Sequence, residues 1–495
     1  MRTVPGRTDR VVVIGAGLGG LSAALHLAGA GREVTVLERD DEPGGRAGVV
    51  RDSGFTFDTG PTVLTMPSLI DESLAAVGES VEDWLTLRRL DPAYRARFAD
   101  GSTLDVRADP DAMADAIRTF CGPRDAEGYR RFVAFLRELY RIEMPHFVDR
   151  NLDSPLALAG RPILDLVRLG AFRRLAPKVA SFMRDERLRR LFTFQAMYAG
   201  LAPQQALAIY AVITYMDTVA GVYYPMGGMH AVPVAMADAA AKHGVQFRYG
   251  TRASSIELSA GRARAVITSN GERIPADVVV VNADLPAAYG ELLPGRFSPR
   301  RLRHSPSCVV LHAGSTVAAP GTAHHTISFG QAWRTTFGEI IRSGRLMSDP
   351  SFLVSTPTLT DPSLAPPGRH AYYALFPAPN LDGRAPASRR RYQDHVLGTL
   401  ERRGFPALAD AEVLHLTTPA DWQARGITAG APFAAAHTFA QTGPFRPSTL
   451  DRRIENVVRC GAHSQPGVGV PMVIVSGRLA AQRVTGSRTA SATMV

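Results

Sequence analysis

A glycine-rich turn between a strand and a helix constrains the fold of this chain more than any other feature. Residues 11–14 are four apolar residues in a row, which is typical of a buried parallel strand. Residues 15–20 read Gly-Ala-Gly-Leu-Gly-Gly and lead into an Ala- and Leu-rich helix. A second strand at residues 34–37 ends in Glu38. This order of strand, turn, helix, strand and acid predicts a dinucleotide-binding unit.

Each residue of the turn has a physical reason to be there. Gly15 permits the tight turn out of the strand, Gly17 lets the backbone approach a pyrophosphate, and Gly20 lets the helix pack closely on the sheet. The start of the helix offers free N–H groups to phosphate oxygens. Glu38 can accept hydrogen bonds from an adenosine ribose and disfavours a 2′-phosphate, so NADP is not expected here. A glycine turn without a ligand is the alternative, and the complete context favours nucleotide binding.

Two further segments narrow the choice of dinucleotide. Gly44-Gly45-Arg46 follows Glu38 closely, and residues 58–62 read Asp-Thr-Gly-Pro-Thr. Together with the first turn, these segments predict that the bound cofactor is FAD.

Length and composition set outer bounds on the protein. With 495 residues, 45% of them hydrophobic and 21% charged, the chain is typical of a globular protein with two or three domains. Its three cysteines are far apart and show no metal-binding spacing, so we expect reduced cysteines and no metal. Residues 1–10 are polar, without the apolar core of a signal peptide, and a cytoplasmic location is expected.

The net charge of +10 is concentrated in one region. Lys178 and Lys242 are the lysines, so arginine supplies nearly all the basic charge and is poor support for nucleic-acid binding; we expect no nucleic-acid partner. Residues 161–190 contain nine basic and three acidic residues, with apolar residues between them. This composition predicts a pair of interfacial helices that face anionic lipid. A solvated charged face is the alternative.

Residues 191–216 contain no charged residue and are long enough to span a bilayer. Pro203 and several glutamines interrupt the run, which favours two buried helical segments joined near Pro203. Its aromatic and methionine residues are candidates for the wall of an apolar site, although ordinary core packing explains each of them singly. The candidates are Phe192, Phe194, Met197, Tyr198 and Tyr210.

The predicted elements divide the chain into an α/β protein with a discontinuous first domain. After residue 221 strands appear, and Asn270-Gly271 between two of them predicts a type I′ hairpin turn. The apolar run 278–281 reads as a strand that returns to the first sheet. We therefore predict a Rossmann-like FAD-binding domain and two further domains. The boundaries are 1–105, 222–290 and 455–495 for the FAD-binding domain, 106–221 for a helical, membrane-associating subdomain, and 291–454 for a mixed-sheet substrate-binding domain.

In five segments the chain resembles the bacterial and fungal type phytoene desaturases, within the FAD amine-oxidase-like proteins. The resemblance extends over nearly the whole chain, and the segments occur in the family's order. They are residues 44–47 with 54–63, 221–228, 282–284, 323–326 and 467–471.

The resemblance implies roles for residues beyond the first turn. Gly45 and Arg46 would approach the pyrophosphate, and Ala253 would meet the adenine through its backbone. The residues implied to lie near the ribityl chain and isoalloxazine ring are Gly60, Pro61, Thr62, Gly461, Gly469, Val470 and Pro471. An Arg-Asp pair that some bacterial members carry falls at Ala157-Leu158 here, so the acid/base residue stays unknown.

The resemblance also implies an activity, which is desaturation of phytoene to lycopene by hydride transfer to flavin N5. The carotenoid would come from the lipid bilayer, with the protein peripheral on the inner, anionic face of the cell membrane. Another carotenoid precursor, a saturase reaction, an amine or porphyrinogen oxidase, and a carrier without flavin remain alternatives. The oligomeric state is unknown.

Overall fold

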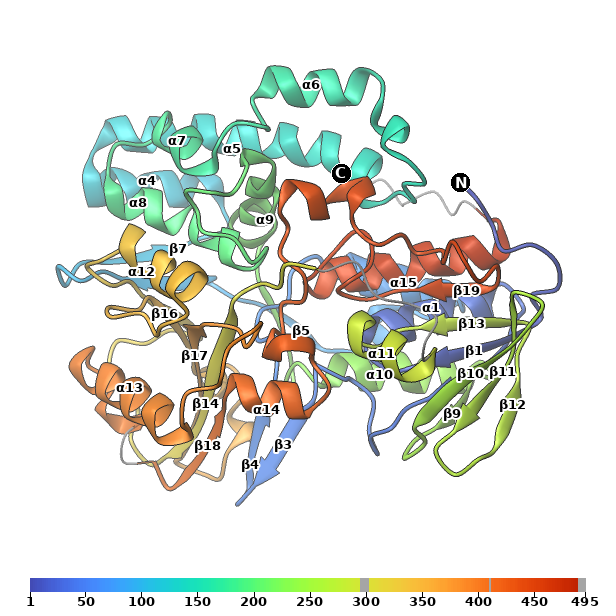
Figure 1. The fold of residues 1–495 in the computed structure, drawn as a ribbon. Helices are drawn as coiled ribbons and strands as arrows, with labels where there is room; N and C mark the ends of the chain where they lie inside the picture. Colours follow the sequence, from blue (N-terminus) through green and yellow to red (C-terminus); the bar gives the residue numbers. More distant parts are fainter. Residues whose placement is uncertain (294–301, 409–410, 488–495) are drawn as a thin grey trace.

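The computed structural model describes residues 1–293, 302–408 and 411–487. Figure 1 shows three parts: a parallel sheet with its helices, a second sheet beside it, and a layer of helices above both. Three short segments lie outside the described residues. Two of them, 294–301 and 409–410, belong to the predicted substrate-binding domain, and the third is the C-terminal tail, 488–495.

The first sheet is parallel and takes its strands from the beginning, middle and end of the chain, as predicted for the discontinuous domain. Its strand order is β19-β13-β1-β2-β9. Val11 of β1 pairs with Val278 of β13, which confirms that residues 278–281 return to the first sheet. The strands are β1 (Arg10–Ile14), β2 (Glu33–Leu37), β9 (Gln246–Arg248), β13 (Val278–Val281) and β19 (Val457–Arg459).

Both faces of this sheet are covered, which explains its continuous valine runs. Val11 and Val13 pack with the helices, whereas Val12 and Ile14 pack with a small antiparallel sheet. A Cβ on Gly477 would lie 2.2 Å from the carbonyl oxygen of Gly19, so two of the helices cross in close contact there. The helices are α1 (Leu18–Gly29), α2 (Ser68–Ala75), α10 (Ala231–Lys242) and α15 (Val470–Thr485), and the other face carries β10 (Ala253–Ser259), β11 (Arg262–Thr268), β12 (Arg273–Pro275) and α11 (Leu285–Leu292).

The predicted type I′ turn between β11 and β12 is wrong, although the hairpin itself is present. A type I′ turn needs positive φ at both central residues. Gly271 has a φ of 85°, but Asn270 is not in that region. Four residues separate the two strands, and the longer loop removes the need for a strained asparagine.

The second sheet is mixed, in the order β18-β14-β17-β16-β15-β6-β7. Two of its strands come from the region around residue 105, where the first segment of the FAD-binding domain was expected to end. Strand β6 lies before that residue and β7 includes it. Strand β6 pairs with β15, with Ala96 opposite Ile327. The chain therefore enters the second sheet earlier than predicted. The strands are β6 (Tyr94–Arg97), β7 (Thr103–Val106), β14 (Ser307–Ser315), β15 (His325–Ser328), β16 (Phe352–Ser355), β17 (His370–Ala378) and β18 (Val413–Thr417).

Short elements connect and cover the two sheets. Two small ribbons pair β3 with β4 and β5 with β8. The ribbons are β3 (Val49–Asp52), β4 (Phe55–Asp58), β5 (Leu87–Arg89) and β8 (Tyr223–Pro225), and the remaining helices of these parts are α3 (Val81–Trp84), α12 (Arg334–Gly338), α13 (Arg389–Arg402) and α14 (Pro419–Ala424).

The helical layer differs in detail from the prediction. Residues 161–190 form three short helices rather than a pair, and residues 191–216 form mostly turns and 3₁₀ helix around one short α-helix. Within the described ranges, no helix is long and apolar enough to cross a membrane. The helices are α4 (Pro110–Cys121), α5 (Pro123–Glu143), α6 (Arg161–Leu169), α7 (Leu175–Ala180), α8 (Glu186–Leu191) and α9 (Ala211–Tyr215).

Candidate cofactor and substrate site

One cavity of about 900 Å³ extends from the first glycine turn to the helical layer. Thirteen of the fourteen residues predicted to hold FAD line it, although they come from seven separate stretches of the chain. They are Gly15, Gly17, Glu38, Gly45, Arg46, Gly60, Pro61, Thr62, Ala253, Gly461, Gly469, Val470 and Pro471. The structure thus brings these residues together, and their contact with the cofactor stays a prediction.

Gly20 lies beneath the cavity rather than in its wall. A Cβ at Gly20 would be 2.1 Å from the carbonyl oxygen of Gly15, a distance that no side chain tolerates. This close approach is the packing role expected for the third glycine of the turn.

The two glycine segments fit against each other and form a cradle. The Gly44 N–H donates a hydrogen bond to the Ala16 carbonyl oxygen at 2.9 Å, and Gly17 and Gly44 are bridged as in a parallel sheet. A Cβ on Gly60 would lie 1.9 Å from the carbonyl oxygen of Arg46, so the third segment also packs against backbone. Side chains are excluded here, so the backbone itself forms this part of the cavity wall.

Glu38 is buried at the adenosine end, where its carboxylate meets backbone donors. One carboxylate oxygen accepts a hydrogen bond from the Ala16 N–H at 2.7 Å, and the other accepts one from the Asp40 N–H at 3.1 Å. Burial raises the pKa of Glu38, and the hydrogen bonds from these two N–H groups lower it in part. Each oxygen keeps a lone pair that can accept a ribose hydroxyl.

Asn282 lies in the family-like segment 282–284, but sequence reasoning assigned it no role. Its side-chain amide donates to the carbonyl oxygens of Gly15 at 3.1 Å and Gly17 at 3.2 Å, and its side chain lines the cavity. It follows β13 directly, at the carboxyl edge of the parallel sheet, where ligands of such sheets bind. The position after the returning strand was the signal that could have identified it.

Arg46 provides positive charge over the cradle and is held by Asp284. The two side chains form an ion pair at 3.1 Å. Burial would raise the pKa of Asp284, but the Arg46 guanidinium and the hydrogen bonds from Thr428 lower it, and that pKa stays below its usual range. The Nε of Arg46 is buried without a hydrogen-bond partner among the described residues, which suits an anionic ligand in the cavity.

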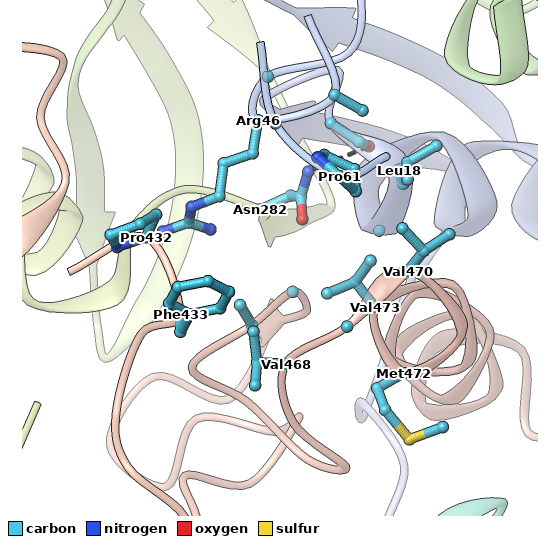
Figure 2. Close-up of a pocket in the computed structure, with 18 of the residues that line it drawn as sticks. Leu18, Arg46, Pro61, Asn282, Pro432, Phe433, Val468, Val470, Met472 and Val473 are labelled. Atoms are coloured by element: carbon cyan, nitrogen blue, oxygen red, sulfur yellow. Dashed lines mark hydrogen bonds between the residues drawn. The ribbon is translucent and has the colours of Figure 1, made fainter. Parts of the chain in front are cut away.

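The start of α15 closes the cavity on the other side. Figure 2 shows Val468, Val470 and Val473 across the space from Arg46, with Asn282 between them. Gly469 precedes the helix and has no side chain to cap it, and Pro471 carries no N–H. The N–H groups of Val470 and Met472 are therefore left to face an electronegative ring edge.

The segment 60–62 is fixed from the second sheet. The Tyr373 hydroxyl on β17 donates to the Gly60 carbonyl oxygen at 2.9 Å, and Ser355 on β16 donates to the Thr62 hydroxyl at 3.4 Å. Both sheets therefore contribute to one site, and the predicted ring-proximal residues lie at their junction.

Beyond this junction the cavity becomes apolar. Of the five predicted wall residues, Tyr198 and Tyr210 line it, whereas Phe192, Phe194 and Met197 do not. Phe192 is fully buried against Tyr129 and Phe132, so core packing explains it. The apolar lining that sequence reasoning missed comes from the turn and loop that follow α5, and from α9 with the turns on either side of it. It consists of Phe147, Val148, Leu152, Ile209, Val212, Ile213 and Met216.

The cavity therefore fits FAD at one end and a long apolar molecule at the other. An acid, a glycine cradle, an arginine and a helix N-terminus occur in the order of ribose, pyrophosphate and ring. Two buried histidines, His463 and His312, carry no charge near neutrality, since burial lowers the pKa of His463 to about 3 and that of His312 to about 4.

Comparison with known proteins agrees with this geometry. The family model for flavin containing amine oxidoreductase matches residues 18–485. A phytoene dehydrogenase from Streptomyces griseus is 56% identical over 99% of this chain and 98% of its own length. A zeta-carotene-forming phytoene desaturase from Myxococcus xanthus is 38% identical over 96% and 93%. A lycopene-forming phytoene desaturase from Paracoccus is 34% identical over 95% and 96%.

Solved structures support the fold. An oxidoreductase from Methanosarcina mazei superposes with a TM-score of 0.65, at 18% identity, over 95% of this chain and 99% of its own. At that identity the likeness concerns the arrangement of the domains.

Proposed function

This chain belongs to the flavin-containing amine oxidoreductase family, with FAD as its cofactor, and we propose that it desaturates phytoene, with lycopene as the expected product. The observation that carries the proposal is the continuity of one cavity from the nucleotide cradle to an apolar end. An apolar polyene offers no group for directional recognition, so apolar walls and shape must position it.

The residues of this chain bind, orient and exclude water. When bound, FAD supplies the acceptor for a hydride at N5. Asn282 and Arg46 would hold the nucleotide end, and the Val470 and Met472 N–H groups at the start of α15 would stabilise the ring edge. Ile213 and Met216 belong to the wall that keeps the substrate dry beside the ring.

Expression in a phytoene-accumulating bacterial host tests the activity. We expect the host to convert colourless phytoene into red lycopene. Accumulation of zeta-carotene would support the reaction with fewer steps, as the name of one relative indicates. Unchanged phytoene, with FAD present in the purified protein, would contradict the proposal. Putrescine as a second substrate separates a desaturase from an amine oxidase.

We also propose that the protein takes its substrate from an anionic membrane surface and is peripheral on the cytoplasmic face. Leu156 is 83% exposed and Phe439 is 67% exposed, in segments that flank the apolar end of the cavity. The turn Gly443–Phe445 packs against Pro155–Leu158, and Thr442 and Gly443 line the cavity. Exposed apolar side chains beside the cavity provide a short route from lipid to the site.

The basic charge supports the same orientation. Helix α6 lies at the outer edge of the helical layer in Figure 1, where Leu164 and Val167 are exposed together with Arg161 and Arg168. Exposed apolar and cationic side chains on one helix suit an anionic interface.

A further inference from the structure

Two carboxyl groups lie buried in the apolar part of the cavity. An apolar polyene has no polar group that could pair with them. Glu143 ends α5, and Asp217 lies in the π-helical turn Met216–Ala220. Both line the cavity and both are less than 5% exposed. One oxygen of each, Oε1 of Glu143 and Oδ2 of Asp217, has no hydrogen-bond partner among the described residues. Burying a carboxyl oxygen without a hydrogen-bond partner costs free energy of folding. This cost indicates that the two groups serve a purpose other than stability.

Asp217 lies toward the junction of the two sheets. Its carboxyl neighbours the Tyr94 hydroxyl on β6, and the Tyr94 ring packs on His325 of β15. The Nδ1 of His325 lies 2.7 Å from the hydroxyl of Ser355, which donates to Thr62 in the predicted ring-proximal segment. Glu143 instead ends α5, in the helical layer. We therefore place Asp217 nearer the expected ring position.

We propose that Asp217 is the catalytic base of the desaturation, accepting the proton from the carbon adjacent to the one that loses hydride. This assignment rests on the proposed function. In each step one C–H bond breaks with both electrons leaving as hydride to FAD. The neighbouring C–H bond breaks with its proton bound by the Asp217 carboxylate, and its electron pair becomes the new C=C bond. The substrate loses two electrons, and FAD gains them.

The surroundings of Asp217 suit a base that works near neutral pH. Burial raises the pKa of Asp217 to about 7, and the neighbouring Tyr94 hydroxyl acts in the opposite direction. The titratable groups facing it are Tyr94 on β6 and Tyr198 in the helical layer, and burial raises the pKa of both well above the usual tyrosine range. His325 packs on Tyr94 and stays neutral, because burial holds its pKa well below the usual value.

Glu143 provides a matched control, since it is a second buried carboxyl on the same cavity wall. The test measures the rate of anaerobic flavin bleaching when holoprotein is mixed with phytoene in liposomes. We expect Asp217→Asn to keep its flavin content and visible spectrum but to bleach at least ~100-fold more slowly, the usual contribution of a general base. Glu143→Gln removes the other carboxyl of the same cavity, and we expect it to slow bleaching at least ~10-fold less than Asp217→Asn does, since Glu143 does not accept the proton. A pH series tests the same point in wild type, whose rate should rise with pH around 7 because the base must be ionised.

The outcomes separate the two proposals. Asp217→Asn bleaching at the wild-type rate, or both variants slowing equally, would overturn the assignment alone. If Asp217→Asn fails to fold, a wild-type rate that stays flat from about pH 5.5 to 8.5 would overturn it. Wild-type holoprotein that phytoene does not reduce would overturn the proposed function, and the assignment with it.

Discussion

Asn282 donates its side-chain amide to the carbonyl oxygen of Gly15 at 3.1 Å, and so ties the end of the returning strand to the turn that would hold the pyrophosphate. We predict that Asn282→Ala binds FAD about 5- to 150-fold more weakly, because backbone carbonyls lose a partner worth about 1–3 kcal/mol. A flavin-binding titration measures this. Asn270→Ala, in the β11–β12 loop, is the control and should leave FAD affinity unchanged.

The close packing at Gly20 gives a second prediction. Gly20→Ala should lower the free energy of unfolding by about 2 kcal/mol or more, because the new Cβ would meet the Gly15 carbonyl oxygen at 2.1 Å. Gly290 is the matched control, since it is also helical and a Cβ there meets no described atom within 4 Å. Gly290→Ala should be neutral or stabilising by up to about 1 kcal/mol. Thermal unfolding of the two variants decides, and equal melting temperatures would contradict the account.

Local sequence patterns predicted which residues of the nucleotide end line the cavity, because the requirements of that end are local. The first strand is followed directly by the turn with Gly15 and Gly17, and the second strand is followed directly by Glu38. The spacing of these residues in the sequence is therefore enough to identify them. Asn282 received no role from the sequence because that role depends on the pairing of β1 with β13, which are far apart in sequence.

The apolar end was harder to predict for a related reason. Both Phe192 and Tyr198 lie in the same uncharged stretch of sequence. Phe192 nevertheless packs into the core, whereas Tyr198 faces the cavity. Short 3₁₀ turns set these directions, and such turns have no strong periodic pattern. The early entry of residues 94–106 into the second sheet likewise depends on the distant strand β15.

His26 gives a prediction on pH and stability. Burial in α1 lowers its pKa from 6.5 to about 3, so the folded protein holds it neutral while the unfolded chain protonates it. The resulting stability is complete above pH 6.5 and is lost as pH falls, by up to about 2 kcal/mol at pH 5. His26→Leu should lack this loss.

Urea unfolding of wild type and His26→Leu at pH 7 and pH 5 provides the measurement. Other buried groups titrate in both proteins and cancel in the comparison. A difference between the two proteins that does not change with pH would contradict the assigned burial effect.

The proposed membrane contact predicts a selective effect of charge on α6. Leu164 is 54% exposed, and Leu164→Asp should reduce binding to anionic liposomes at least ~10-fold, because an inserted leucine side chain contributes about 1.5–3 kcal/mol. Leu359 is 50% exposed near the second sheet, so Leu359→Asp is a matched control that should bind like wild type. Binding should also weaken as salt rises. Binding that ignores both salt and Leu164→Asp would contradict this orientation.

The central claim is that a bound flavin, held between the glycine cradle and α15, accepts the electrons of an apolar polyene. Anaerobic titration of the yellow holoprotein with phytoene in liposomes tests it most directly. We expect the oxidised flavin absorbance to fall while the absorbance of a conjugated polyene appears. In the first turnover, the moles of flavin reduced should equal the moles of double bonds formed. A flavin that stays oxidised while phytoene remains unchanged would contradict it.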